Sequence, residues 1–454
     1  MNLLLSPLWL IILPLATAPA IFVIRRRGRL AGLLAALSTL ITVRLCLSMP
    51  FDWSIDVLGR DISLQPPGRV FLACIFLLAT IYLIYASFLS QGRAFCYLIL
   101  VIMALLAAVT MLQSSVVAVL LLEITVIFMV LIVQSDSQRS VRGTLYYLIA
   151  MGMAGPLLLV MVHLTQMRAL NPVDNVLPQT AAFLLVLGGA ALLGAVPFHA
   201  WLYNVGIEGS PLVVGFITSI AHGVIFFKLL GLLREFPWLI RDGNVLLLML
   251  IVGLASVIMG GLLSFFQKEL SGVFAWLVLF DTGCLLIGLS ATSVEGLAVV
   301  AFLWANRAIS VTLIGMGMGM LRKERELHSF RDLNGIIWQK PFSVLAIAIG
   351  GLSLTGFPLT AGFTARWLVV QSLPAGSQRW AVILIIAGAT ASIGRLRWLA
   401  ATAGRSSERT SEGEPWIFRI LVILLLAANI LSALYPQVVL QPLTQIMGAW
   451  VVAP

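Results

Sequence analysis

The chain has 454 residues, of which 61% are hydrophobic and 10% charged, and its mean hydropathy is +1.07. Soluble globular domains are near half apolar and a quarter charged, so this composition excludes that class and indicates a polytopic membrane protein. The formal net charge of +10 comes from Lys and Arg scattered among loops. This scatter argues against nucleic acid as a partner and fits the positive bias of cytoplasmic loops.

The N-terminal apolar run, MNLLLSPLWLIILPLATAPAIFVI, is interpreted as a retained first span. It has no basic segment ahead of it, it is longer than the apolar region of a signal peptide, and its arginines follow it. Along the whole chain, apolar runs of about 17 to 25 residues predict an all-α fold with about fourteen membrane helices. The runs begin near residues 5, 29, 69, 94, 115, 144, 178, 211, 244, 272, 295, 341, 379 and 416.

The loops rich in Lys and Arg follow odd-numbered spans and predict the orientation of the chain. Examples are RRRGR at 25–29, DSQRSVRG at 136–143 and the long segment at 322–340. The loop SMPFDWSIDVLGRDISLQPPGR at 48–69, which follows an even-numbered span, is near neutral. With an even number of spans, both termini lie on the non-cytoplasmic side of a bacterial-type inner membrane.

Several ionisable residues lie within the predicted spans, where a charge costs at least about 2.5 to 3.5 kcal/mol on insertion scales. Such residues are candidates for a proton path, and Glu123 and Asp281 occupy matching mid-span places in their runs. An interhelical salt bridge is the structural alternative for each. For Lys228, which is close to a helix end, snorkelling to the interface is the simpler interpretation. The full candidate set is Glu123, His222, Lys228, Asp281, Arg307 and Arg366.

Cofactor ligands have no recognisable pattern in the sequence. The four cysteines, Cys46, Cys74, Cys96 and Cys284, lack the paired spacing of zinc, iron–sulfur or dithiol sites, and the four histidines do not cluster. Glycine-rich nucleotide loops are also missing from any strand-to-helix context. We therefore predict that the chain itself holds no cofactor and no metal.

Two segments with Pro and Gly interrupt the apolar runs. VPFHAWLYNVGIEGSP (196–211) separates spans 7 and 8, and LSLTGFPLTAGFTARW (352–367) falls inside span 12. Paired interruptions are typical of inverted-repeat transporters, in which broken helices line hydrated cavities. We expect broken helices near spans 7 and 12 and two inverted five-helix repeats, spans 4–8 and 9–13. The alternative is that Gly and Pro are simply common in membrane helices.

This pattern predicts four segments. They are an N-terminal three-helix segment (1–93), a first repeat (94–235), a second repeat (244–402), and a cytoplasmic loop with a C-terminal helix (403–454). Under this division Glu123 and Asp281 both lie on the second helix of their repeat, which supports two related halves.

Four segments resemble motifs of the antiporter-like subunits of complex I, particularly the subunit N type. VPFHAWLYNVGIEGSP is similar to the PFHxW…GxP signature that joins spans 7 and 8, and LSLTGFPLTAGFTARWLVV to the span 12 pattern. SFFQKELSGVFAWLVLFDTG resembles the loop and span 10, and LLEITVIFMVLIVQSD the span 5 motif. Together they cover roughly residues 95–400 in the same order. The wider superfamily includes Mrp-type cation/proton antiporter subunits and the membrane arms of energy-converting hydrogenases.

The resemblance implies a proton path through a Glu in span 5, Lys residues in spans 7 and 8, and a Lys or Glu in span 12. Glu123 matches the first position, but Leu192 stands at the span 7 Lys, His222 at the span 8 Lys and Arg366 at the span 12 position. An imidazole exchanges protons near neutral pH, whereas a guanidinium keeps its charge. Without a lysine at 192, Glu123 is either paired with His222 or another cation, or held neutral by burial.

The resemblance therefore implies a proton-translocating membrane subunit of a complex I-like, NADH-quinone oxidoreductase-type complex, without a redox centre of its own. Its implied partners are other hydrophobic antiporter-like and small membrane subunits in the lipid bilayer and, through them, a peripheral iron–sulfur module. Two alternatives stay open. One is a structural, non-pumping subunit of a related hydrogenase-type complex, and the other is a subunit of an Mrp-like cation/proton antiporter.

Overall fold

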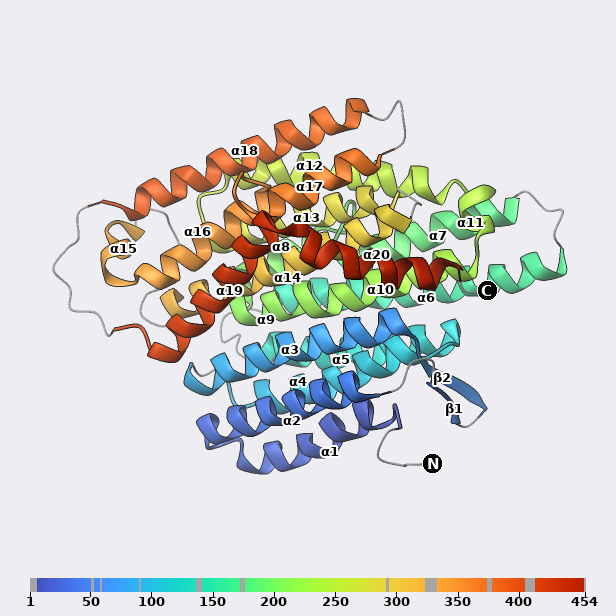
Figure 1. Ribbon diagram of the computed structural model, residues 1–454, viewed down its shortest axis with the longest axis horizontal. Coiled ribbons are helices and arrows are strands. Elements are labelled where there is room, and N and C mark those ends of the chain that lie inside the picture. The colour runs from blue at the N-terminus through green and yellow to red at the C-terminus, as the bar shows by residue number, and fades with distance from the viewer. Residues whose placement is uncertain are drawn as a thin grey trace. The chain divides into compact units, whose positions relative to one another are not determined.

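Figure 1 shows the computed structural model of the chain, which is predominantly helical. It describes residues 6–49, 53–57, 59–89, 91–135, 141–171, 176–290, 294–322, 333–373, 378–404 and 413–452. The described residues contain two strands, β1 (Trp53–Val57) and β2 (Arg60–Leu64), which form an antiparallel hairpin.

Eleven helices of the described residues are long and apolar enough to cross a membrane, and three shorter apolar helices accompany them. The eleven are α2 (Gly28–Ser48), α3 (Pro66–Phe88), α5 (Ser115–Ser135), α6 (Arg142–Leu170), α7 (Val176–Leu193), the continuous run of α9 (Pro211–Phe216), η2 (Ile217–Ala221) and α10 (His222–Glu235), α12 (Val245–Phe266), α13 (Leu270–Leu289), α14 (Val294–Arg322), α18 (Gln378–Thr402) and α19 (Trp416–Leu434). The shorter ones are α1 (Trp9–Ile24), α4 (Phe95–Met111) and α16 (Pro341–Thr355). The predicted polytopic helical protein is confirmed, whereas about fourteen spans and the inverted repeats stay predictions.

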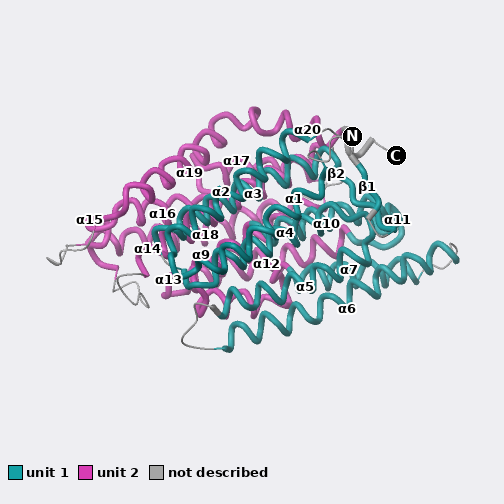
Figure 2. The backbone as a smooth tube through the Cα atoms, turned by 90° about the horizontal axis from the view of Figure 1, so that it is seen from below, with its two compact units in different colours: residues 1–192, 220–245, 449–454 teal, residues 193–219, 246–448 magenta. Residues whose placement is uncertain are grey.

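The remaining helices are shorter or less apolar: α8 (Ala200–Glu208), α11 (Trp238–Arg241), α15 (Ile336–Gln339), α17 (Ala361–Ser372) and α20 (Pro436–Val452). The helices form two compact units (Figure 2). Unit 1 comprises residues 1–192, 220–245 and 449–454, and unit 2 comprises residues 193–219 and 246–448. The four segments predicted from sequence describe an internal repeat, whereas the two units describe how compactly the helices pack. The predicted segment boundaries therefore stay predictions.

In unit 1, small residues let α2 and α3 pack closely. Gly32 on α2 lies so close to Ser87 on α3 that an added Cβ would be 2.7 Å from the serine Cβ. Thr39 and Thr80 share a buried hydroxyl hydrogen bond of 2.8 Å. Membrane helices lack a hydrophobic force between them and associate through such small residues and polar contacts.

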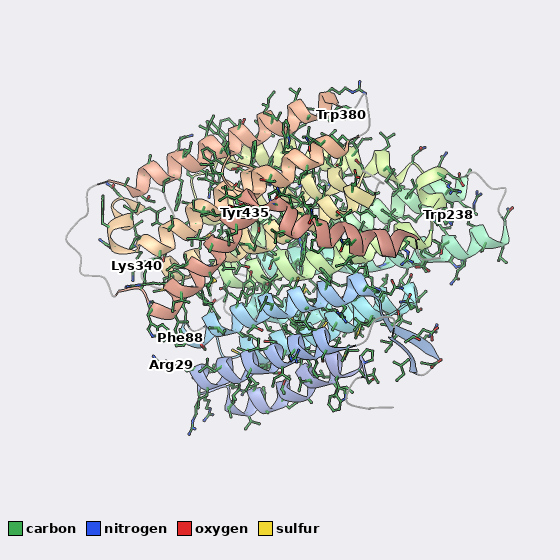
Figure 3. The ribbon with its side chains drawn as sticks, in the orientation of Figure 1. Arg29, Phe88, Trp238, Lys340, Trp380 and Tyr435 are labelled. Carbon is green, nitrogen blue, oxygen red and sulfur yellow. The ribbon has the colours of Figure 1, made fainter. Side chains whose placement is uncertain are left out.

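In unit 2, α13 is almost entirely buried and packs against α14, α16 and α17. Two glycines bring α12 close to it, because a Cβ on Gly283 would lie 2.5 Å from the Gly253 carbonyl oxygen. At the start of α16, next to Lys340 (Figure 3), the Glu414 carboxylate accepts hydrogen bonds from the N–H groups of Phe342 (3.0 Å) and Ser343 (2.7 Å). These bonds satisfy donors that a helix N-terminus leaves free.

The helices break at both predicted places. After α7, Gly194 takes φ +62°, and after α16, Gly356 takes φ +79°, a left-handed conformation that glycine adopts without steric penalty. The segment 196–211, predicted as a connection between two spans, instead contains the nine-residue helix α8. It forms because Trp201, Leu202 and Val205 present one buried apolar face of that short helix.

Candidate functional site

A charge cluster is buried within unit 2. The Arg366 Nη2 donates to Asp281 Oδ1 at 2.6 Å, and the Arg307 Nη1 lies 3.7 Å from Asp281 Oδ2. Asp281 and Arg307 are 0% exposed and Arg366 is 8% exposed. The three residues come from α13, α14 and α17, so the structure brings together half of the candidate set predicted from sequence.

The break between α16 and α17 positions Arg366. The last carbonyls of a helix lack intrahelical partners, and Arg366 donates to those of Ser353 (3.0 Å) and Leu354. Its Nη1 also donates to the Gly362 carbonyl at 3.0 Å. A Cβ on Gly356 would lie 2.8 Å from Arg366 Cδ, so glycine leaves room for this side chain. One guanidinium thus stabilises the broken helix and faces the carboxylate, a geometry that its planar fork of donors allows.

Arg307 connects the same carboxylate to a π-helical turn. Its Nε donates to the Thr218 carbonyl and its Nη1 to the Thr282 hydroxyl, both at 2.9 Å. One turn away on α14, Trp304 Nε1 donates to the Ser219 carbonyl at 3.0 Å. Thr218 and Ser219 belong to η2, and single π turns inside α-helices are frequent at functional sites. Arg307 therefore ties the backbone of this turn to Asp281.

The cluster carries two guanidinium groups and one carboxylate, a net charge of +1 when all are ionised. A guanidinium has no acceptor and does not lose its proton in proteins, so Asp281 is the one member that can gain or lose a proton. A buried ion pair needs good geometry and further hydrogen bonds to offset desolvation. The other contacts of both arginines supply some of these bonds, whereas Asp281 Oδ2 and Arg366 Nε have no hydrogen-bond partner among the described residues.

An amide network that the sequence analysis missed lies beside the break. Asn306 Oδ1 accepts from the Ser353 hydroxyl at 2.7 Å and from Asn429 Nδ2 at 3.2 Å. Asn429 also donates to Ser353 Oγ at 2.9 Å, and its Oδ1 accepts from the Ala361 N–H at 3.4 Å. The available signal was an asparagine inside each of two apolar runs, which a search for charged residues passes over.

Glu123, His222 and Lys228 belong to unit 1. Glu123 lies on α5 and its carboxyl group fills the space beside Gly155 of α6, where an added Cβ would be 2.6 Å from the carboxyl carbon. His222 is the first residue of α10 and is 1% exposed. Lys228 is partly exposed, and its Nζ donates to the Leu112 carbonyl at the end of α4, at 2.8 Å. The roles of all six candidates in a proton path stay predictions.

Metal ligands do not gather in the part of the chain that the structure describes: no group of three or more His, Cys, Asp or Glu is placed to hold an ion. The four cysteines are free thiols.

Charges buried at a helix break, inside a bundle of apolar helices, define a polytopic membrane protein built around an intramembrane charge cluster. The family described as NADH:quinone oxidoreductase/Mrp antiporter, TM, matches residues 114–392, more than half of the chain, and the chain belongs to this family. The predicted membership of the complex I and Mrp superfamily is therefore confirmed.

Curated relatives carry the name NADH-quinone oxidoreductase subunit N. The protein of Hydrogenovibrio crunogenus is 26% identical over 276 residues, which cover 57% of this chain and 57% of the relative. That of Hirschia baltica is 25% identical over 289 residues, 61% of this chain and 60% of the relative. The matched region thus spans less than two thirds of these relatives.

Solved structures share the fold over nearly the whole chain. A chain of respiratory complex I from Thermus thermophilus with bound NADH gives a TM-score of 0.82 at 18% identity and covers 99% of this chain and 100% of that one. The membrane-bound sulfane sulfur reductase, an archaeal respiratory membrane complex, gives 0.84 at 18% identity with 98% of each chain covered. The Mrp complex from Dietzia sp. DQ12-45-1b gives 0.83 at 16% identity, covering 100% and 98%. At these identities the likeness shows the fold alone.

Proposed function

We propose that the chain is a proton-translocating, antiporter-like membrane subunit of a complex I-like respiratory complex of the NADH-quinone oxidoreductase type. The observation that carries this proposal is Asp281, a fully buried carboxylate held by Arg366 beside a helix break. Family membership and the name of the curated relatives support it. Buried intramembrane charge is costly and marks ion or proton paths in membrane proteins.

Each candidate residue has a distinct part in this path. Asp281 gains and loses the proton in unit 2, while Arg366 and Arg307 set the field around it and hold its geometry. Glu123 and His222 are the groups of unit 1 that exchange protons, since both side chains titrate. The Lys228 amine donates to the Leu112 carbonyl at the end of α4, and we place Lys228 at this end of the path in unit 1. Proton transfer between these sites needs water or motion to connect them.

We also propose the number of spans, the two repeats and the orientation of the chain. We assign about fourteen spans by adding the three shorter apolar helices to the eleven long ones. The first repeat covers residues 94–235 and the second residues 244–402, between the segments 1–93 and 403–454. The helix breaks after α7 and α16 fall at corresponding places of the two repeats, which supports an inverted relationship. Both termini then lie on the non-cytoplasmic side of a bacterial-type inner membrane.

The proposed subunit performs no redox chemistry itself. It holds no cofactor and couples to a peripheral iron–sulfur module through neighbouring hydrophobic membrane subunits. The structural relatives come from complexes, which supports membrane partners of this kind. Energy from the redox reaction reaches this chain as a change in charge or conformation at its neighbours.

The test is proton uptake by sealed inverted membrane vesicles that contain the whole complex. Asp281→Asn keeps the shape of the side chain but removes its titration, so we expect complexes that assemble with this variant to move fewer protons per NADH oxidised. Asp242→Asn is the matched control, because Asp242 pairs with Arg168 at an exposed site. Normal proton uptake by a fully assembled Asp281→Asn complex contradicts the proposal.

A second candidate function is a structural subunit that conducts no protons, and one observation favours it. Leu192 occupies the position at which the family resemblance implies a lysine, and it is buried. In that case no substitution in the cluster changes proton uptake. Sodium-driven proton exchange without an electron donor supports instead the Mrp-like antiporter.

A further inference from the structure

Unit 1 contains a cavity of about 560 Å³. The proposed proton path includes one of its lining residues, Lys228, and gives the rest of the cavity no role. The cavity wall comes from α3, α4, α5, α6, α7 and α10, from the end of β2, and from the residues before α3 and after α4. Along α10 the wall runs from Val224 to Glu235, which corresponds to about 16 Å of helix. The cavity is therefore elongated along α10, and its volume is typical of small-molecule sites.

One end of the cavity is polar. It lies where α3 begins, α4 ends, α5 begins and α10 ends. Arg234 donates to Gln65 Oε1 at 3.2 Å, and the Ser115 hydroxyl donates to Glu235 at 2.9 Å. These bonds join neighbouring helix ends into a polar rim.

The charge of the lining favours an anion. Lys228, Arg234 and Glu235 are its ionisable side chains, two cations and one carboxylate, so the net charge is +1. The Lys228 amine uses one donor for the Leu112 carbonyl at 2.8 Å. An ammonium group has three donors, which leaves two for a ligand in the cavity.

The other part of the lining is apolar. Its side chains are those of Leu122, Leu158, Leu192, Val224, Ile225 and Leu229. Leu192 keeps this wall uncharged, whereas a lysine at the same position would place a charge in it. Water needs several polar partners to occupy a cavity stably, and these side chains offer none. The inner part is thus suited to hydrocarbon.

We infer that this cavity binds one acyl chain of an anionic amphiphile, with the carboxylate or phosphate head group on Lys228 and the chain along Leu122, Leu158 and Leu192. Positive charge near the rim and apolar surface further in match the two ends of such a molecule. The ligand is either a free fatty acid or a bilayer phospholipid with one chain inserted. This is a binding site, and its tests do not depend on proton translocation by the chain.

The first test is photolabelling of the full chain in lipid nanodiscs with a photoactivatable palmitate. Wild-type protein is expected to be labelled on α5, α6 or α10 and to show saturation. Lys228→Gln removes a charge-assisted hydrogen bond and should weaken labelling about tenfold. The matched control is Lys268→Gln, because Lys268 is exposed and belongs to unit 2. Equal labelling of Lys228→Gln and wild type overturns the assignment of the head group.

A second pair of variants tests the apolar wall. Leu192→Lys places a charge along the acyl chain and should reduce labelling by at least about tenfold, whereas Leu192→Met keeps the volume and should label like wild type. Equal labelling of the lysine variant overturns the position of the chain. Leu192→Cys extends this test, since rapid reaction with a charged methanethiosulfonate reagent would reveal a hydrated cavity and overturn the inference.

Two measurements on unaltered protein keep the inference testable if a variant fails to fold. Hexadecanoate should displace the label, and hexadecyltrimethylammonium, with the same chain length but opposite charge, should not. Equal displacement by both overturns the preference for anions. Native mass spectrometry of the purified chain then distinguishes the sources by the mass of the bound adduct, a fatty acid or a phospholipid, and a chain that never retains or binds either overturns the inference.

Discussion

Arg366 on α17 donates to Asp281 on α13 at 2.6 Å and also to carbonyls that the break after α16 leaves free. The same side chain therefore stabilises a broken helix and compensates a buried carboxylate. Arg307 approaches the second carboxylate oxygen at 3.7 Å and holds the π turn η2. Through its two arginines, Asp281 is thus connected to the helix break after α16 and to the Thr218 carbonyl in the π turn.

Coupling between Asp281 and Arg366 can be measured with a double-mutant cycle of Asp281→Asn and Arg366→Gln. Removing one partner of a buried ion pair costs about 3 to 5 kcal/mol, because the other charge stays buried. We expect each single variant to be strongly destabilised and the double variant to be less destabilised than the sum, by about 1 kcal/mol or more. The free energies of unfolding are measured by denaturant titration of the purified chain in detergent.

Arg168 and Asp242 provide the control cycle, since their 3.1 Å pair is partly exposed to solvent. Exposed pairs contribute about 0 to 1 kcal/mol, so Arg168→Gln and Asp242→Asn should show little coupling. Additive effects of Asp281→Asn and Arg366→Gln would mean that the two side chains do not interact in the folded protein.

Arg307→Gln should loosen the π turn. The shorter amide cannot reproduce the donation from Arg307 Nε to the Thr218 carbonyl together with the bond to Thr282. Hydrogen–deuterium exchange of a peptide that covers η2 is expected to accelerate. Trp304→Phe removes only the bond to the Ser219 carbonyl and should have a smaller effect. Unchanged exchange in Arg307→Gln would show that the turn is stable without this arginine.

Sequence alone identifies Asp281, Arg307 and Arg366 as charges within the bundle but not as one cluster, and it misses Arg395, which is 2% exposed. Asp281 is identified by its place within an apolar run, yet its partner lies 85 residues away on a helix whose direction depends on the break. The break itself is predictable from Pro and Gly, because these residues interrupt helices in a known way. The π turn is not, since the residues of Ile217–Ala221, ITSIA, fit an α-helical turn equally well. The amide pair Asn306 and Asn429 is missed because neither side chain carries a charge.

Arg395 on α18 is expected to destabilise the isolated chain. It is 2% exposed, and its three guanidinium nitrogens have no hydrogen-bond partner within the described ranges, although the Trp398 ring lies 5.8 Å away. Burial of an uncompensated charge costs several kcal/mol. Arg395→Met should therefore raise the free energy of unfolding of the purified chain by about 1 kcal/mol or more.

The matched control for this charge is Arg397→Met. Arg397 lies two residues further along α18, is exposed, and stacks over the Phe265 ring at 5.1 Å. Surface substitutions of this kind usually change stability by less than about 0.5 kcal/mol. A loss of stability in Arg395→Met would show that the guanidinium has a favourable partner in the folded chain.

Gly155 on α6 makes the space that the Glu123 carboxyl group occupies, and a Gly155→Ala variant tests this contact. The added Cβ would lie 2.6 Å from the carboxyl carbon, so α5 and α6 must separate or Glu123 must move. Overpacking of this kind costs about 1 to 3 kcal/mol. Gly152→Ala is an ideal comparison, because an added Cβ at that position meets nothing within 4 Å. It should be neutral or stabilising by up to about 1 kcal/mol, since alanine is the better helix former. Thermal unfolding of the two variants in the same detergent gives the answer, and equal stability would show that the Glu123 side chain moves aside without cost, so that this contact does not hold α5 and α6 together.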